Sequence, residues 1–145
     1  MTHPLNGACH CGSIRVAFMP SMSAADLPLR ACQCGFCRRH GARTTSDPAS
    51  SLHITAVPGS LGRYRFGRRQ VDALMCRECG VYVGSLLSVG NHLLATLNVA
   101  GSDLDAFAGR TAEPISYDHE TDAEKLARRK ARLTPTVLVE ASPSA

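Results

Sequence analysis

The sequence predicts a single, mainly β domain whose strands run between metal-binding cysteine clusters. Three observations support this prediction. All seven cysteines fall in three clusters, over residues 9–11, 32–37 and 76–79. Between the clusters, short segments alternate apolar and polar residues with the period of two that places one face of a strand in a core. Only one segment, near the C-terminus, has the pattern of a stable helix.

Length and composition agree with one small domain. The chain has 145 residues, 44% of them hydrophobic, but no Trp and only 5% aromatic residues, so bound metal would help to stabilise so small a core. No apolar run is long enough to cross a membrane, and the N-terminus lacks the basic and apolar regions of a signal peptide. We therefore expect a cytoplasmic protein without a membrane partner, and reduced cysteines.

The basic charge of the chain has an explanation other than nucleic-acid binding. The formal net charge is +4. Seven thiolates and two Zn²⁺ ions would bring it close to +1, which makes nucleic acid an improbable partner. Arginines near the clusters are then interpreted as partners of thiolates or of an acidic ligand, with an ordinary solvated basic surface as the alternative. These arginines are Arg15, Arg38, Arg39 and Arg77.

Alternation predicts most of the strands. The clearest is residues 13–18, in which Ile14, Val16 and Phe18 are expected on the buried face. The same reasoning predicts strands at 52–56, 61–66, 71–76, 81–87 and 92–100, the last in the centre of the sheet, with turns at 58–59, 67–70 and 89–91 and loops at 19–28 and 38–51.

The C-terminal part predicts helices. Residues 101–103 are expected to cap a short helix over 104–108. Residues 122–133 form the one convincing helix, with acids at its start and bases at its end, as the helix dipole favours. After Pro135, residues 136–140 are expected to add an edge strand. We divide the chain into a zinc-binding β domain, 1–120, and a C-terminal helix and tail, 121–145, packed on it or extending from it.

The cysteine spacings predict two zinc ions. Cysteines two apart on a strand point to one face, and cysteines three apart around a turn do likewise. A glycine follows one cysteine in each cluster, and glycine accepts the positive φ that lets a backbone fold around sulfur. The simplest division gives one ion Cys32, Cys34 and Cys37 and closes the other with Cys9, Cys11, Cys76 and Cys79. The alternatives are one four-cysteine site beside three reduced thiols, and an iron–sulfur cluster.

A three-thiolate zinc suits thiol chemistry. Such an ion keeps net negative charge, so it activates water poorly but can hold a soft ligand such as a substrate thiol. His40, three residues after Cys37, is the alternative fourth ligand, which would make this second zinc structural. His10 is expected to point away from the metal, and His53 to be an ordinary strand residue.

The ordered motifs Gly7-Ala8-Cys9-His10-Cys11-Gly12, Cys32-Gln33-Cys34-Gly35-Phe36-Cys37-Arg38-Arg39, Tyr64 and Cys76-Arg77-Glu78-Cys79-Gly80 resemble a known family. It is the family of glutathione-dependent formaldehyde-activating enzymes, which also includes the centromere protein V (CENP-V) domain. The resemblance covers residues 5–103. It implies an Mss4-like fold of several coiled antiparallel β-sheets around two zinc sites. It also implies structural zinc on Cys9, Cys11, Cys76 and Cys79, and catalytic zinc on Cys32, Cys34 and Cys37.

For the named enzyme, the resemblance implies a carbon–sulfur lyase that joins formaldehyde and glutathione as S-hydroxymethylglutathione. We therefore expect a zinc-dependent lyase acting on a small thiol adduct, as a monomer or homodimer, with His40 beside the three cysteines in catalysis. Arg38, Arg39 or Arg65 would hold substrate carboxylates, and His40 or Glu78 would move the proton. Two alternatives remain: a non-catalytic zinc module that binds a protein or nucleic acid, and a zinc or redox sensor.

Overall fold

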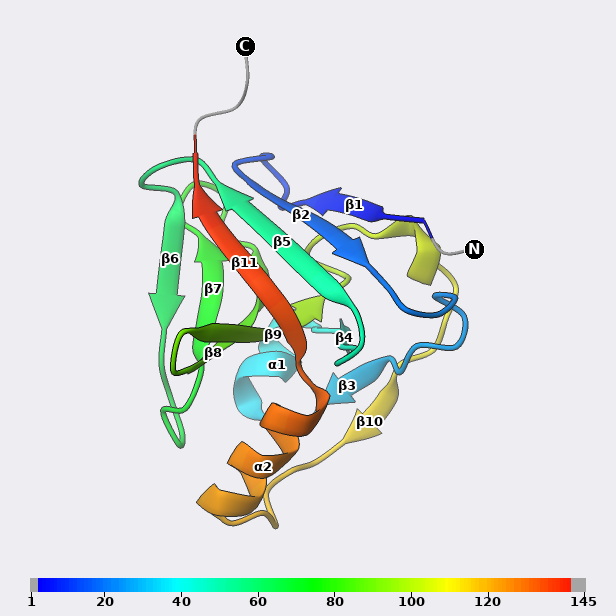
Figure 1. Cartoon of the computed structure of the whole chain (residues 1–145), viewed down its shortest axis with the longest axis vertical. Helices are drawn as coiled ribbons and strands as arrows, with labels where there is room; N and C mark the ends of the chain where they lie inside the picture. The colour runs from blue at the N-terminus through cyan, green and yellow to red at the C-terminus, as the bar shows by residue number, and fades with distance from the viewer. Residues whose placement is uncertain (1–2, 142–145) are drawn as a thin grey trace.

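The computed structural model describes residues 3–141 and confirms a mainly β protein with a short C-terminal helix (Figure 1). Residues 1–2, and residues 142–145 at the end of the predicted tail, lie outside the described residues. The helices are α1 (Gly35–His40), the 3-10 turn η1 (Asp105–Phe107) and α2 (Asp122–Arg132). The strands are β1 (Leu5–Ala8), β2 (Ile14–Met19), β3 (Arg30–Cys32), β4 (Thr44–Thr45), β5 (Ser51–Ala56), β6 (Leu61–Tyr64), β7 (Asp72–Cys76), β8 (Tyr82–Val89), β9 (His92–Asn98), β10 (Glu113–Ile115) and β11 (Thr134–Glu140).

Hydrogen bonds join these strands into one mixed sheet, whereas the resemblance implied several antiparallel sheets. The main path runs β1-β2-β5-β11-β9-β4-β3-β10, and β8, β7 and β6 branch from β9. Two pairings are parallel, β10 with β3 and β11 with β5. The sheet therefore has two parts, β1-β2-β5 and β9 with its neighbours, and β11 pairs with both.

The strand predicted at 136–140 is the main part of β11. Residues 136–140 pair with β5 in parallel, and residues 134–136 pair with β9 antiparallel. Residues 137–140 therefore have a single strand neighbour among residues 3–141, as the edge prediction requires. The pairing of residues 134–136 with β9 was not predicted, and it makes β11 the link between the two parts of the sheet.

The alternating pattern of β2 has the predicted effect. Ile14, Val16 and Phe18 are almost fully buried, and they belong to the main hydrophobic core together with residues of β5, β8 and β9. A second, small apolar cluster surrounds Cys37 and Tyr82. Burial of the apolar face of a strand is the main favourable contribution to its stability.

The predicted loop at 38–51 is wrong at two places. Residues 38–40 end α1, and residues 44–45 form β4. The helix was missed because it has only six residues, too few for a periodic pattern; it begins where the Cys34 side chain accepts a hydrogen bond from the Cys37 amide, and ends at Gly41 with φ of 56°.

The helix predicted at 104–108 is only the single 3-10 turn η1. Its N-cap residue is Leu104, which makes no side-chain capping bond, so the expected capping by residues 101–103 is also wrong. The helix predicted at 122–133 is confirmed as α2. Its N-terminus carries a capping box, in which Thr121 and Glu124 each bond the backbone of the other. Within residues 3–141, no helix is long and apolar enough to cross a membrane.

Candidate metal centres

Four cysteine sulfurs from two turns form one compact group. Cys9 and Cys11 lie in the turn between β1 and β2, and Cys76 and Cys79 begin the turn between β7 and β8. The Sγ atom of Cys11 is 3.8 Å from that of Cys9 and 3.6 Å from that of Cys76. Zinc–sulfur bonds of about 2.3 Å in a tetrahedron give sulfur–sulfur distances of about 3.8 Å. The spacing of this four-thiol group therefore fits Zn²⁺.

The two turns hold their sulfurs in similar ways. The amide of Ile14 donates to the Cys9 sulfur at 3.3 Å, and the amide of Cys79 donates to the Cys76 sulfur at 3.5 Å. The glycines after the second cysteines have positive φ, 83° at Gly12 and 79° at Gly80, as the Cys-Gly motif predicted. The cysteines converge through these turns, so the expectation that alternation along a strand aligns them is wrong.

Electrostatics of the four-thiol group favour a cation. Burial raises the pKa of Cys76 to about 12. Burial acts in the same direction at Cys79, but backbone hydrogen bonds from Cys11 and Val81 outweigh it and lower the pKa of Cys79 to about 6. One thiol thus ionises readily because backbone amides stabilise its thiolate, while another resists because it is buried. A divalent cation among the four sulfurs would stabilise all four as thiolates.

Cys32, Cys34 and Cys37 form the second group, the three-thiol group. Cys32 ends β3, Cys34 caps α1, and Cys37 lies within α1, so that the three sulfurs are within 4.8 Å of one another. The Cys37 amide donates to the Cys34 sulfur at 3.3 Å. Gly35 begins the helix without positive φ, so the glycine argument is wrong at this cluster.

The sulfurs of the three-thiol group also perturb one another. Hydrogen bonds from Cys32 and Cys37 lower the pKa of Cys34 to about 2. The interactions with Cys32 and Cys34, followed by burial, raise the pKa of Cys37. Three ionised thiols at these distances require a neighbouring positive charge, so this donor set also fits Zn²⁺. Within residues 3–141, no histidine nitrogen or carboxylate oxygen lies close enough to join the group.

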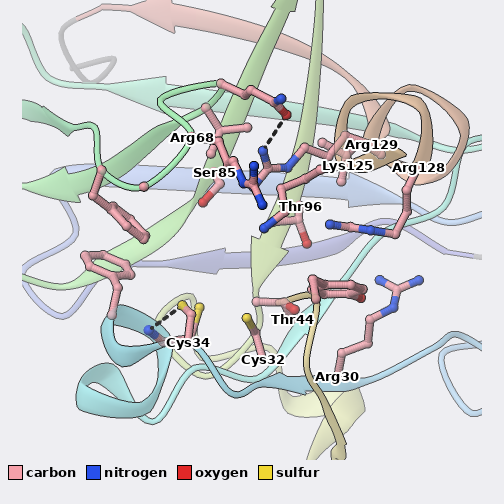
Figure 2. Close-up of a pocket in the computed structure, with 18 of the residues that line it drawn as sticks. Arg30, Cys32, Cys34, Thr44, Arg68, Ser85, Thr96, Lys125, Arg128 and Arg129 are labelled. Atoms are coloured by element: carbon pink, nitrogen blue, oxygen red, sulfur yellow. Dashed lines mark hydrogen bonds between the residues drawn. The ribbon is translucent and has the colours of Figure 1, made fainter. Parts of the chain in front are cut away.

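The three-thiol group opens into a cavity, which we call the central cavity. It has a volume of about 660 Å³ and is lined by α1 and α2, by β8 and β9, and by all three thiols (Figure 2). No member of the four-thiol group lines it. Cys9 instead borders a separate, more open depression beside residues 100–103. The two groups therefore differ in access: only the three-thiol group faces the central cavity.

Aromatic rings form one side of the central cavity. Phe36 of α1 stacks on Phe66 with ring centroids 4.9 Å apart, and its edge meets the buried ring of Tyr82 at the same distance. His40 packs 4.5 Å from Phe36 and does not line the cavity. This histidine thus stands beside the aromatic cluster and outside the thiol group, and its catalytic role stays a prediction.

The other predicted site residues divide by position. Arg39 lines the central cavity and donates to the carbonyl of Gly35 at 2.9 Å, whereas Arg38 donates to the carbonyl of Gln33 and does not line it. Arg65 is paired with Asp72. Glu78 lies in the turn of the four-thiol group, and like Arg15, Arg65 and Arg77 it is not part of the cavity wall.

Sequence reasoning missed two features of the cavity. The first is the hydroxyl pair of Tyr82 and Ser85, whose oxygens are 2.7 Å apart; burial, and then the nearby Cys37, raise the pKa of Tyr82. The second is the position of the basic residues of α2. The sequence suggested the helix over 125–132 as a surface for a protein or nucleic-acid partner, but its bases line the central cavity: Lys125, Arg128, Arg129 and Arg132. Their spacing of three and four residues places them on one helix face, a signal that the sequence does contain.

This chain is similar to known proteins in both sequence and structure. The model of the family described as "Glutathione-dependent formaldehyde-activating enzyme" matches residues 4–114. A crystal structure of a Rhodobacter sphaeroides protein is similar to this chain, with 28% sequence identity and a TM-score of 0.60. The similarity covers 77% of this chain and all of that one. Both matches agree with the resemblance in the cysteine motifs.

Proposed function

Because this chain belongs to the family of glutathione-dependent formaldehyde-activating enzymes, we propose that it is a zinc-dependent carbon–sulfur lyase. Its substrate is a small thiol adduct such as S-hydroxymethylglutathione. Cys32, Cys34 and Cys37 would hold the catalytic zinc, and Cys9, Cys11, Cys76 and Cys79 the structural one.

One observation supports the division of roles. The three-thiol group lines the central cavity, and the four-thiol group does not. Four cysteine ligands complete the tetrahedral shell of a structural zinc, whereas three leave a coordination position for a substrate. A substrate thiol that enters the cavity can therefore reach Cys32, Cys34 and Cys37.

In the addition direction, the substrate sulfur forms a bond to the carbon of formaldehyde. The electrons of the carbonyl π bond move to its oxygen, which takes up a proton, and the reverse steps release formaldehyde. Zinc, when bound, would lower the pKa of the substrate thiol and so favour the nucleophilic thiolate. The protein residues bind the thiol, orient it and handle the proton.

The hydroxyl pair of Tyr82 and Ser85 is our candidate for contact with the reacting oxygen. Both residues line the central cavity, and Figure 2 shows Ser85 on its wall. A hydroxyl that already donates within such a pair can pass a proton along it. His40 and Glu78, which the sequence suggested, lie outside the cavity wall.

Exchange between formaldehyde and S-hydroxymethylglutathione, followed by NMR, tests the proposal. Zinc-loaded protein should accelerate the exchange at least about a hundredfold over buffer, and Cys32→Ala should abolish the acceleration. Free Zn²⁺ at the protein's concentration is the control. Exchange no faster than in this control would exclude formaldehyde and glutathione as reactants.

A further inference from the structure

One wall of the central cavity is built by a segment outside the family match. The match ends at residue 114, and α2 begins at Asp122. In Figure 2, Lys125, Arg128 and Arg129 extend from α2 into the space opposite Cys32 and Cys34. The family match therefore does not cover the part of this wall that α2 contributes.

The charges around the central cavity are far from balanced. Eight basic side chains line it, but only one acidic side chain, that of Asp118, does so. Within residues 3–141, only two of the eight bases form ion pairs: Arg68 with Asp122, and Arg128 with Glu120. A three-thiol group loaded with zinc adds about one negative charge to the cavity, which is fewer than the basic side chains left without an ion pair, so the wall keeps a net positive charge.

Two of the unpaired bases are half-buried. Arg30 donates to the neutral hydroxyl of Ser46 at 3.1 Å, and Arg129 donates to the neutral amide of Gln70 at 2.8 Å. Burial lowers the pKa of both guanidinium groups, and nearby arginines lower each further. Arginine nevertheless stays charged, so this crowding costs free energy that a bound anion would offset.

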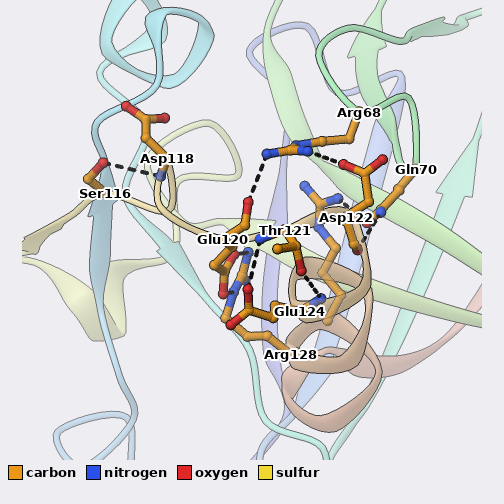
Figure 3. Close-up of polar contacts among 10 residues, drawn as sticks. Arg68, Gln70, Ser116, Asp118, Glu120, Thr121, Asp122, Glu124 and Arg128 are labelled. Atoms are coloured by element: carbon orange, nitrogen blue, oxygen red, sulfur yellow. Dashed lines mark hydrogen bonds and ion pairs between the residues drawn. The ribbon is translucent and has the colours of Figure 1, made fainter.

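The basic side chains of α2 and the start of this helix are held in place before any ligand binds. Arg128 makes two hydrogen bonds to Glu120, at 2.9 and 3.0 Å, and lies over the Tyr117 ring. At the start of α2, Arg68 pairs with Asp122, and Gln70 donates to the Asp122 carbonyl at 3.0 Å (Figure 3). A preorganised set of donors loses little conformational entropy on binding.

We call the basic face of α2 that lines the central cavity the α2 wall; it consists of Lys125, Arg128, Arg129 and Arg132. We propose that the α2 wall and Arg30 bind the end of the substrate remote from its sulfur, and that this end carries two or more negative charges. The inference rests on the proposed function and narrows its substrate class. Glutathione has two carboxylates but also an ammonium group, for which the cavity offers the single carboxylate of Asp118. A thiol with a phosphate, or with several carboxylates and no ammonium group, matches the wall better.

Binding to zinc-loaded protein, measured by calorimetry without formaldehyde, tests this. Two probe pairs compare a charged thiol with an analogue that lacks its negative charges: 4′-phosphopantetheine with pantetheine, which has a hydroxyl in place of the phosphate, and mercaptosuccinate with its dimethyl ester. The charged member of at least one pair should bind about tenfold tighter or more. The pair that responds distinguishes a phosphate from carboxylates.

Variants of α2 test whether the preference for the charged probe depends on the α2 wall. Lys125→Gln and Arg129→Gln should each reduce it about threefold or more. Lys130→Gln is the matched control, because it removes the same charge from an exposed position of α2 outside the cavity. The preference of this variant for the charged probe should stay within a factor of about two of the wild-type value. Lys125 takes part in none of the ion pairs found within residues 3–141, so its variant should fold normally.

Equal affinities within both pairs would overturn the proposal, as would a preference that survives both variants. Since the assay contains no formaldehyde, a failed lyase assay does not affect its result. Charge-selective binding without lyase activity would reject the proposed function and keep the inference. Lyase activity without charge-selective binding would support the proposed function and reject the inference.

Discussion

The sulfur atoms of Cys11 and Cys76 lie 3.6 Å apart although 65 positions separate the two residues in the chain. Cys11 belongs to the turn of β1 and β2, and Cys76 to the end of β7, on the other part of the sheet. The four-thiol group therefore connects the same two parts that β11 joins by hydrogen bonds.

This connection predicts that Cys76→Ser unfolds the domain. Structural zinc contributes roughly 10–16 kcal/mol in zinc-finger peptides, and whole domains are stable by only about 5–15 kcal/mol. Circular dichroism and urea titration should show a largely unfolded variant at 25 °C. Cys32→Ala is the comparison and should keep a cooperative transition; a Cys76→Ser protein as stable as the wild type would contradict the structural role.

Metal content provides a second prediction. The native protein should contain two zinc ions per chain, since two donor groups fit the ion. Cys32→Ala should retain one, measured by atomic absorption after gel filtration. Two ions in that variant would mean that the three-thiol group does not hold zinc.

Tyr82→Phe should impair catalysis more than binding. The substitution keeps the buried ring and removes only the hydroxyl that pairs with Ser85. Loss of a proton-transfer group reduces the rate by about 10²–10⁴-fold, so kcat should fall by at least tenfold while KM changes little. Steady-state kinetics with unchanged zinc content would establish this, and an unaltered kcat would remove the hydroxyl pair from the mechanism.

Two adjacent arginines allow a comparison within α1. Arg39 lines the central cavity and Arg38 does not. If Arg39 contacts an anionic group of the substrate, Arg39→Gln should raise KM about threefold or more, because a charged hydrogen bond is lost. Arg38→Gln should have a smaller effect. The reverse order would place the substrate on the outer face of α1.

The ion pair of Glu120 and Arg128 should stabilise the α2 wall with a defined pH dependence. The hydrogen bonds from Arg128 lower the pKa of Glu120 below its usual 4.5. Its contribution is therefore complete above about pH 4.5 and is lost as the pH falls through the lower folded pKa. The wild-type advantage over Glu120→Gln in unfolding free energy should be constant from pH 7 to 5 and shrink below 4.5.

Taking that difference cancels pH effects shared by both proteins, such as protonation of the cysteines. At pH 7, a double-mutant cycle with Arg128→Met should give a coupling of about 1–3 kcal/mol for this largely buried pair. No measurable coupling would mean that Glu120 does not hold Arg128 in place.

Local patterns in the sequence predict much of this protein, and tertiary contacts account for the rest. The buried face of β2 and the helix α2 follow from short-range alternation and end charges. The link that β11 makes between β5 and β9 does not, because nothing in residues 134–136 indicates a second strand partner. The grouping of cysteines followed from counting donors, but their support by turns depends on pairings between distant strands.

The α2 wall shows the same limit at the site. Its four bases at helical spacing are visible in the sequence, yet an amphipathic basic face alone equally describes a solvated helix. Tertiary contacts fix this face opposite the three-thiol group: the chain returns through β11 after α2, and Arg68 and Gln70 bond to Asp122 at its start.

The link that β11 makes between β5 and β9 also has a consequence for biosynthesis. A ribosome completes both of these partner strands before it reaches residues 134–140. Among residues 3–141, no other strand pairing joins the two parts of the sheet, so until then each part exposes an open edge to association with other chains. Zinc captured early by the cysteines at 9, 11, 76 and 79 would clamp those parts together during translation and protect them from aggregation.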